Sequence, residues 1–158
     1  MASTQYIGKA GHLAVMGEFC YRGYNAAMPE IDKGDDVFVV NDATGAMWRL
    51  QVKTSLGRAQ TTSRVFQFRV RENAIQIAQT PELHFVFVMR FRSCWHFLLI
   101  DRPVLRAYVR NNKMGSAANA YRQFTMTLRE EDDNLKIVCS GVDLSNHLED
   151  WAAWPKLD

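Results

Sequence analysis

Cysteine is scarce in this chain of 158 residues, and its cysteines follow no metal-binding or disulfide pattern. Cys20, Cys94 and Cys139 are odd in number, widely spaced and without a C-x-x-C pair, which argues against a disulfide framework and a zinc ribbon. We therefore expect free thiols, buried or half-buried, in a reducing compartment.

Long apolar runs and nucleotide-binding signatures are also missing. No run approaches the ~20 apolar residues that cross a bilayer, and residues 1–11 lack the apolar segment of a secretory signal. No G-x-x-x-x-G-K-[ST] motif occurs, so ATP-driven translocation is not expected. Without repeats or a Pro/Ser-rich linker, the sequence predicts one soluble domain over residues 1–158, in the cytoplasm and with no membrane partner.

Charge is nearly balanced over the whole chain but not along it. The formal net charge is +2, yet residues 1–48 carry −3, residues 49–122 carry +10 and residues 123–158 carry −5. A basic middle of this size favours a polyanionic partner. The alternative is that these arginines only solvate strand edges and helix faces, because a segment of sequence need not form one surface patch.

Hydrophobic periodicity predicts an α/β fold in which a mixed β-sheet is flanked by helices. A helix is expected over residues 12–21, with Leu13, Met16, Phe19 and Cys20 on its apolar face and Gly23 as its stop. Strands are expected over residues 36–40 and 47–54, antiparallel around a turn at 42–45. Further strands are expected at 65–70, 85–89, 95–100 and within 124–140, helices at 103–111 and 145–154, and an exposed loop at 112–120.

Alternation on the strand at 47–54 places chemically active side chains on one face. Residues two apart on a strand point to the same side, so Gln51 and Lys53 face one site, which Asp36 enters from the neighbouring strand. A lysine beside apolar neighbours needs an anion or carboxylate partner. Asp36 and Glu18, which lies on the early helix, offer oxygen ligands that suit Mg²⁺.

These residues resemble the PD-(D/E)XK superfamily of nucleases, also called restriction-endonuclease-like. The matched segments are Gly17-Glu18, residues 29–37 (PEIDKGDDV) and residues 50–54 (LQVKT). The resemblance implies a mixed sheet between helices, with Asp36 as the metal-binding aspartate, Lys53 as the catalytic lysine and Glu18 as the helical glutamate of many members. Gln51 departs from the family pattern, which has a carboxylate there, although a Q-x-K variant occurs among homing endonucleases of the superfamily.

The resemblance implies hydrolysis of a phosphodiester bond with Mg²⁺, for which Mn²⁺ would substitute. Asp36, Glu18, the amide oxygen of Gln51 and the carbonyl of Val52 are the candidate metal ligands. Lys53 would orient the attacking water or stabilise charge that develops on the phosphate. Asp32 and Asp35 compete with Asp36 for the ligand role, and Asp36 is favoured because it directly begins the apolar strand. Individually, Glu18 also fits a solvated helix face, Asp36 a strand start and Lys53 an edge-strand residue.

The function expected is that of a DNA endonuclease that acts as a homodimer or larger assembly, because cutting both strands requires two sites. Four arginines interleaved with Phe66 and Phe68 suit a duplex-facing surface that binds phosphates: Arg58, Arg64, Arg69 and Arg71. One alternative is a catalytically inactive nucleic-acid-binding protein with this fold, in which Gln51 has weakened the metal site. A second is a protein-interaction module, which would show no salt-dependent affinity for DNA.

Overall fold

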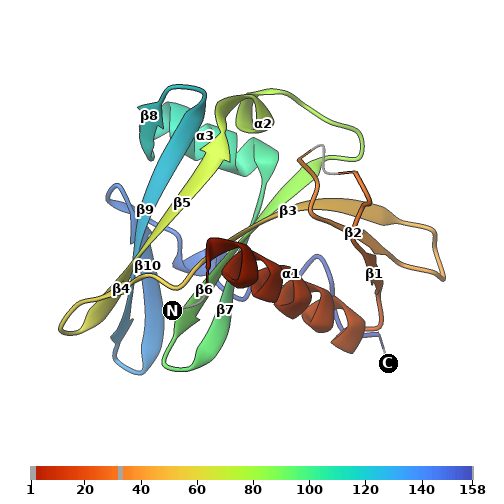
Figure 1. The fold of residues 1–158 in the computed structure, drawn as a ribbon, viewed down its shortest axis with the longest axis horizontal. Coiled ribbons are helices and arrows are strands. Elements are labelled where there is room, and N and C mark those ends of the chain that lie inside the picture. The colour runs from red at the N-terminus through yellow and green to blue at the C-terminus, as the bar shows by residue number, and fades with distance from the viewer. Residues whose placement is uncertain (1–2, 32–33, 158) are drawn as a thin grey trace.

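The computed structural model describes residues 3–31 and 34–157, which form two β-sheets packed against each other (Figure 1). The first sheet contains, in spatial order, β1 (Asn25–Ala27), β2 (Val37–Val40), β3 (Met47–Ser55), β6 (Leu83–Phe91) and β7 (Cys94–Asp101). The second contains β11 (Val142–Asp143), β10 (Asn134–Cys139), β9 (Tyr121–Glu131), β5 (Ser63–Arg71) and β4 (Arg58–Ala59), with β8 (Ser116–Ala118) paired to β9. The helices are α1 (Thr4–Tyr21), α2 (Glu72–Gln76) and α3 (Arg102–Asn111), and Ser145–His147 form a 3₁₀ turn.

The first sheet is mixed, which confirms the predicted fold class. β3 and β6 run parallel, with Gln51 opposite Phe85 and Lys53 opposite Phe87. The other neighbouring pairs are antiparallel, including β2 with β3, as predicted. The two-residue turn Arg92-Ser93 joins β6 to β7 with both residues at positive φ, which matches the right-handed twist of a hairpin.

Helix α1 covers one face of the first sheet, and its contact face differs from the predicted one. The helix begins at Thr4, and its buried residues are Gly11, Val15 and Phe19. A Cβ at Gly11 would lie 1.8 Å from Thr54 Oγ1, so only glycine permits this close approach to β3. The expectation for Leu13 is wrong, because the helix turns this residue to solvent. Cys20 and Cys94 are likewise exposed rather than buried.

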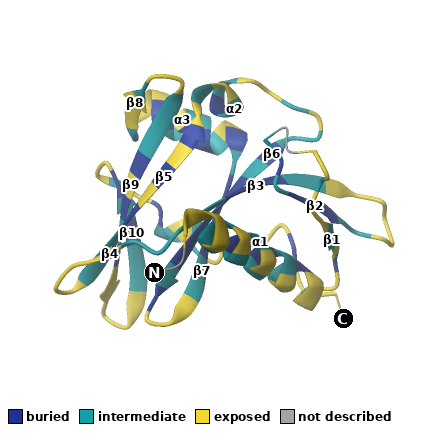
Figure 2. Ribbon diagram, in the orientation of Figure 1, coloured by how far each residue is buried: buried dark blue, intermediate teal, exposed yellow. Residues whose placement is uncertain are grey.

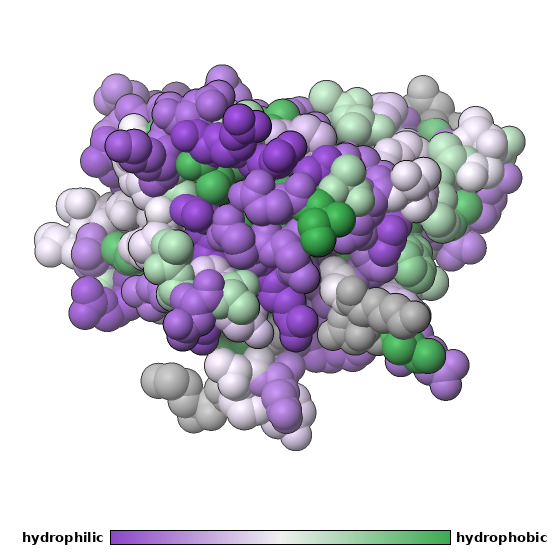
Figure 3. Space-filling model, turned by 90° about the horizontal axis from the view of Figure 1, so that it is seen from above, coloured by the Kyte–Doolittle hydropathy of each residue, from purple (hydrophilic) through white to green (hydrophobic). Residues whose placement is uncertain are grey.

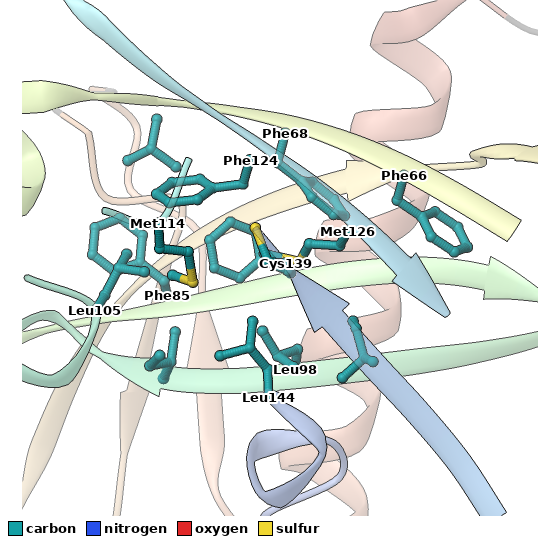
Figure 4. Close-up of a cluster of buried hydrophobic side chains, with 14 of the residues drawn as sticks. Phe66, Phe68, Phe85, Leu98, Leu105, Met114, Phe124, Met126, Cys139 and Leu144 are labelled. Carbon is teal, nitrogen blue, oxygen red and sulfur yellow. The ribbon is translucent and has the colours of Figure 1, made fainter. Parts of the chain in front are cut away.

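The largest hydrophobic core lies between the two sheets. Phe87 of β6 packs there against Phe68 of β5 and Phe124 of β9, and Phe85 belongs to the same cluster (Figure 4). The alternate β6 residues Val86 and Val88 pack on the α1 side, so β6 is covered on both faces, as its continuous apolar sequence predicts. Buried residues accordingly run along the centre of the first sheet, while the hairpin tips and the outer side of α1 are exposed (Figure 2).

The C-terminal segment is irregular and contains turns where a helix was expected over 145–154. Only Ser145–His147 form a helical turn, and Glu149 adopts a positive φ of 54°. The Glu149 amide donates to the Phe97 carbonyl at 2.8 Å, and the Phe97 amide donates to the Glu149 carboxylate at 3.0 Å. These bonds fasten the segment to the edge of β7, and Trp154 is buried against Phe19.

The segment expected to be an exposed loop at 112–120 is partly ordered into the second sheet. Its residues 116–118 form β8, and Met114 is fully buried in the main core. Over residues 3–31 and 34–157, no helix combines the length and the apolar character that crossing a membrane would require.

Candidate active site

A pocket of about 360 Å³ lies between the β2–β3 part of the first sheet and the β5–β9 part of the second. The register of β3 with β6 places Gln51 and Lys53 on the face of the first sheet that carries the core phenylalanines. β1 and β2 lie beyond the edge of the second sheet (Figure 1), and the surface seen from above is mostly hydrophilic (Figure 3). The residues that line the pocket are Gly34, Asp36, Gln51, Lys53, Arg69, Arg71 and Tyr121; we call this set the pocket.

Asp36 is held in the pocket by the neighbouring strand. Its amide donates to the Leu50 carbonyl at 2.8 Å, and its carboxylate oxygen Oδ2 accepts from the Val52 amide at 2.7 Å. The carboxylate therefore crosses from the start of β2 to the middle of β3. Val52 contributes its amide to this contact, while its side chain is buried on the α1 side.

Gln51 is buried, and only one end of its amide has a partner. Its Nε2 donates to the Gly34 carbonyl at 3.0 Å, which fixes the orientation of the amide because a carbonyl accepts only from the NH₂ group. Oε1 is buried without a hydrogen-bond partner among the described residues. An unsatisfied buried oxygen costs about 1–3 kcal/mol, so this atom is suited to accept from, or coordinate, a bound group.

Three cations share the pocket. Lys53 has no hydrogen bond or ion pair with another residue in the described part of the chain. Arg69 and Arg71 enter from alternate positions of β5, and the Arg69 guanidinium lies 4.7 Å from the centre of the Tyr121 ring. The neighbouring carboxylate of Glu72 is bound to Arg122 at 3.0 Å instead. This arrangement leaves positive charge available to an anion such as phosphate.

Burial and hydrogen bonds act in opposite directions on the pKa of the Glu72 carboxyl group. Burial raises the pKa of this carboxyl, but hydrogen bonds from Arg122 and Gln76 outweigh burial and leave the pKa below its ordinary value. Glu72 is therefore a stable anion whose charge is already matched, and it does not neutralise Arg71.

The candidate acids other than Asp36 occupy different positions. Asp35 is buried and receives two bonds from Arg49, at 3.2 Å and 2.5 Å, so it is fully engaged in a structural pair. Glu18 lies 3.8 Å from Arg22, whose guanidinium packs over Trp151. This flank of α1 faces the C-terminal segment, and Glu18 is not among the residues that line the pocket. Asp32 lies outside the described residues.

Strand alternation places the four predicted phosphate-binding arginines on two different sides of the second sheet. Arg69 and Arg71 line the pocket, and Arg58 is paired with Val65 on the same outward side of the second sheet. Arg64 projects to the other side, where it donates to the Arg90 carbonyl at 2.9 Å. Sequence reasoning did not identify Tyr121, because only the pairing of β5 with β9 brings it opposite Arg71.

The donor set fits a magnesium ion that retains most of its water. No group of three or more His, Cys, Asp or Glu residues capable of holding a metal occurs among residues 3–31 and 34–157. Mg²⁺, however, typically takes only one or two protein carboxylates and keeps several waters. The Asp36 carboxylate and the unsatisfied amide oxygen of Gln51 would supply oxygen ligands of this kind.

Comparison with known proteins gives a structural relative but no sequence family. No family model and no curated protein matches the chain. The structure is similar to that of a bacterial homing endonuclease, I-Ssp6803I, with a TM-score of 0.58 and 18% sequence identity. The similarity covers 97% of this chain and 91% of that one. The chain therefore has the overall fold of this nuclease.

Proposed function

We propose that this chain is a metal-dependent endonuclease that hydrolyses phosphodiester bonds in DNA. The observation that carries the proposal is that Asp36, Gln51 and Lys53 converge on one pocket together with Arg69 and Arg71. The fold shared with a homing endonuclease supports it, as does the basic middle of the sequence. The residues also match the PD-(D/E)XK pattern in its Q-x-K form.

In this mechanism, Asp36 and Gln51 would hold Mg²⁺ or Mn²⁺. The bound ion would polarise the scissile phosphate and lower the pKa of a coordinated water. Glu18 and the Val52 carbonyl, also expected as ligands, remain predictions; Glu18 lies beside Arg22 and does not line the pocket.

The protein's own cations act on the phosphate. Lys53 orients the attacking water or stabilises the negative charge that develops on the phosphate oxygens, which is effective because the group is positioned in advance. Arg69 and Arg71 bind phosphates of the DNA backbone and set its path through the pocket. Cleavage of both strands requires two pockets, so we propose a homodimer or larger homo-oligomer.

Cleavage assays with purified protein test this function. Plasmid and linear duplex DNA are incubated with Mg²⁺ or Mn²⁺, and the native chain is expected to nick or cut them. Asp36→Ala and Lys53→Ala should each lower the rate by about 100-fold or more. The matched controls Asp42→Ala and Lys113→Ala change exposed residues outside the pocket and should cut like the native chain.

Two results would contradict parts of the proposal. Cleavage that survives both pocket substitutions would place the active site elsewhere. DNA binding without cleavage in either metal would instead favour a catalytically inactive binding module. Binding of either kind should weaken with salt, because each neutralised phosphate steepens the logarithmic salt dependence by about 0.9.

A further inference from the structure

Four polar residues of the second sheet form a row that begins at the pocket and runs along β5 and β9. We call Gln67 and Arg69 of β5, with Gln123 and Thr125 of β9, the polar strip. The register pairs Arg69 with Gln123 and Gln67 with Thr125, and paired residues in an antiparallel ladder project to the same side. The residues between them on each strand are buried in the core. The strip therefore faces away from the core, and all its members except the half-buried Gln123 are exposed.

The functional groups of the polar strip are available to a ligand. In the part of the chain that the structure describes, no hydrogen bond to another residue uses the side chain of Gln67, Gln123 or Thr125. The outward positions of β5, and those of β9 as far as Arg129, carry no carboxylate. Amide, hydroxyl and guanidinium groups thus stand side by side without an opposing charge.

We infer that the polar strip reads base sequence in the major groove of duplex DNA, an inference that rests on the proposed nuclease function. Glutamine binds adenine through two hydrogen bonds, and threonine contacts either the base edge or the thymine methyl, while Arg69 at the pocket end of the strip binds the backbone phosphate. Two antiparallel strands such as β5 and β9 fit the major groove, which is about 12 Å wide. The strip combines these side chains on such a pair of strands.

The position of the polar strip beside the pocket gives this reading a defined place on the DNA. Arg69 belongs to both the strip and the pocket, so a duplex whose backbone enters the pocket lies against the strip. Arg71 and Gln67 are four residue steps apart on β5, which corresponds to about 13 Å at 3.3 Å per residue. Since base pairs are about 3.4 Å apart, the bases read by the strip should lie within about four base pairs of the cut.

The charge around the polar strip indicates how the groove would be oriented. Arg58 is on the same side of the sheet, opposite Val65 of β5. On the β9–β10 side of the strip, Lys136 and Arg129 form ion pairs with Glu131. Unpaired positive charge therefore borders the strip on the β4–β5 side and in the pocket, where it would contact phosphates.

Sequencing of cleavage products from a random DNA pool tests the inference. The full chain is incubated with Mn²⁺ and duplexes that carry a randomised central segment, and the ends produced are sequenced to give the base preference at each position. The native chain should show preferences within about four base pairs of the cut. Gln67→Ala and Gln123→Ala should each reduce the preference at one or two of these positions by about 10-fold, the discrimination expected from a bidentate contact.

A surface control separates base reading from a general effect of substitution. Gln5→Ala changes an exposed glutamine on α1 and should leave every base preference as in the native chain. Thermal unfolding of all three variants checks that they fold, and their unfolding temperatures should stay close to that of the native chain. Native preferences that persist in both Gln67→Ala and Gln123→Ala would overturn the inference while leaving the nuclease function intact.

Selection by binding keeps the test independent of cleavage. The same pool is bound in Ca²⁺, and retained duplexes are separated by gel shift and sequenced. The native chain could cut no duplex in Mg²⁺ or Mn²⁺ and still select sequences in Ca²⁺. If Gln67→Ala and Gln123→Ala then abolish this selection, the inference stands although the proposed enzymatic function fails. Retention of double-stranded RNA with equal affinity would overturn the inference, because the deep, narrow major groove of RNA does not admit side chains.

Discussion

The pocket and the Arg102 site contain polar groups under opposite conditions. Arg102, at the start of α3, is 5% exposed and donates two bonds to the Glu82 carboxylate at 2.6 Å and 2.7 Å, and a third to the Ile75 carbonyl at 3.3 Å. In the pocket, Gln51 Oε1 has no partner among the described residues, and Lys53 lies near two arginines. The protein itself satisfies the polar groups of the first region, whereas the second keeps a buried oxygen without a partner among the described residues.

This difference predicts which substitutions change the stability of the protein and which change its activity. Breaking a satisfied buried pair leaves a charge without compensation and lowers stability. Removing one of several like charges from an open pocket removes repulsion and affects the ligand instead. Substitutions in the Arg102 site should therefore change unfolding, while those in the pocket should change DNA cleavage.

The largest expected effect is on cleavage by Lys53→Met. The substitution keeps an unbranched side chain but removes the positive charge, so we expect the single-turnover rate on duplex DNA to fall about 100- to 1,000-fold. The free energy of unfolding should change by less than about 0.5 kcal/mol, since Lys53 forms no ion pair in the described chain. Urea unfolding measures the second quantity, and Lys113→Met is the matched control. A large loss of stability would show that Lys53 is a structural residue.

The opposite pattern is expected for Glu82→Gln. An amide keeps the size of the carboxylate but removes the charge that is hydrogen-bonded to the buried Arg102 and leaves only the weaker influence of Asp101, so the free energy of unfolding should fall by about 3 kcal/mol. Glu131→Gln is the control, because this exposed carboxylate pairs with Arg129 and Lys136 at the surface and should cost less than about 1 kcal/mol. Cleavage by Glu82→Gln, measured well below its unfolding temperature, should match the native rate. Equal stability losses in the two variants would remove the distinction drawn for the Arg102 site.

Acid should erase the stability difference between the native chain and Glu82→Gln. Hydrogen bonds from Arg102 lower the pKa of Glu82 below its ordinary value of 4.5, so the unfolded chain takes up this proton more readily than the folded one. The stabilisation is then fully present above pH 4.5 and is lost as pH falls through the lowered pKa. Urea unfolding at pH 7 and at successive pH values below 4.5 should show the two curves converging. A difference that grows on acidification would contradict the assigned ion pair.

Sequence information located the strand residues of the pocket because strand alternation is strict. Asp36 precedes the apolar strand, and Gln51 and Lys53 are two residues apart, so the structure brings them together as predicted. Their catalytic roles remain predictions. The helix was harder, because its phase depends on which residue meets the sheet. Gly11 approaches Thr54 so closely that it fixes this phase. A pattern of apolar residues does not identify a glycine as a contact residue.

Contacts between distant segments were outside the reach of sequence patterns. The pocket combines β2 and β3 with β5 and β9, and Tyr121 joins it only through the second sheet. The alternation of β5 predicts that Arg69 and Arg71 share a side, but not that this side meets the pocket. The C-terminal segment shows the same point, since its irregular course depends on bonds between Glu149 and the edge of β7.

The smallest expected effect, and the sharpest on the pocket, is a change in metal affinity by Gln51→Glu. The native Nε2 donates to the Gly34 carbonyl, whereas a carboxylate would face that carbonyl with like partial charge. Without metal the variant should therefore be less stable than the native chain, and Mn²⁺ should restore it by neutralising the added carboxylate. We expect about tenfold tighter Mn²⁺ binding, or about 1.4 kcal/mol, seen as a larger rise in unfolding temperature with Mn²⁺ than in the native chain. Gln5→Glu adds the same charge on exposed α1 and should respond to Mn²⁺ like the native protein. If Gln51→Glu responds no more strongly than this control, the amide oxygen of Gln51 does not face the metal.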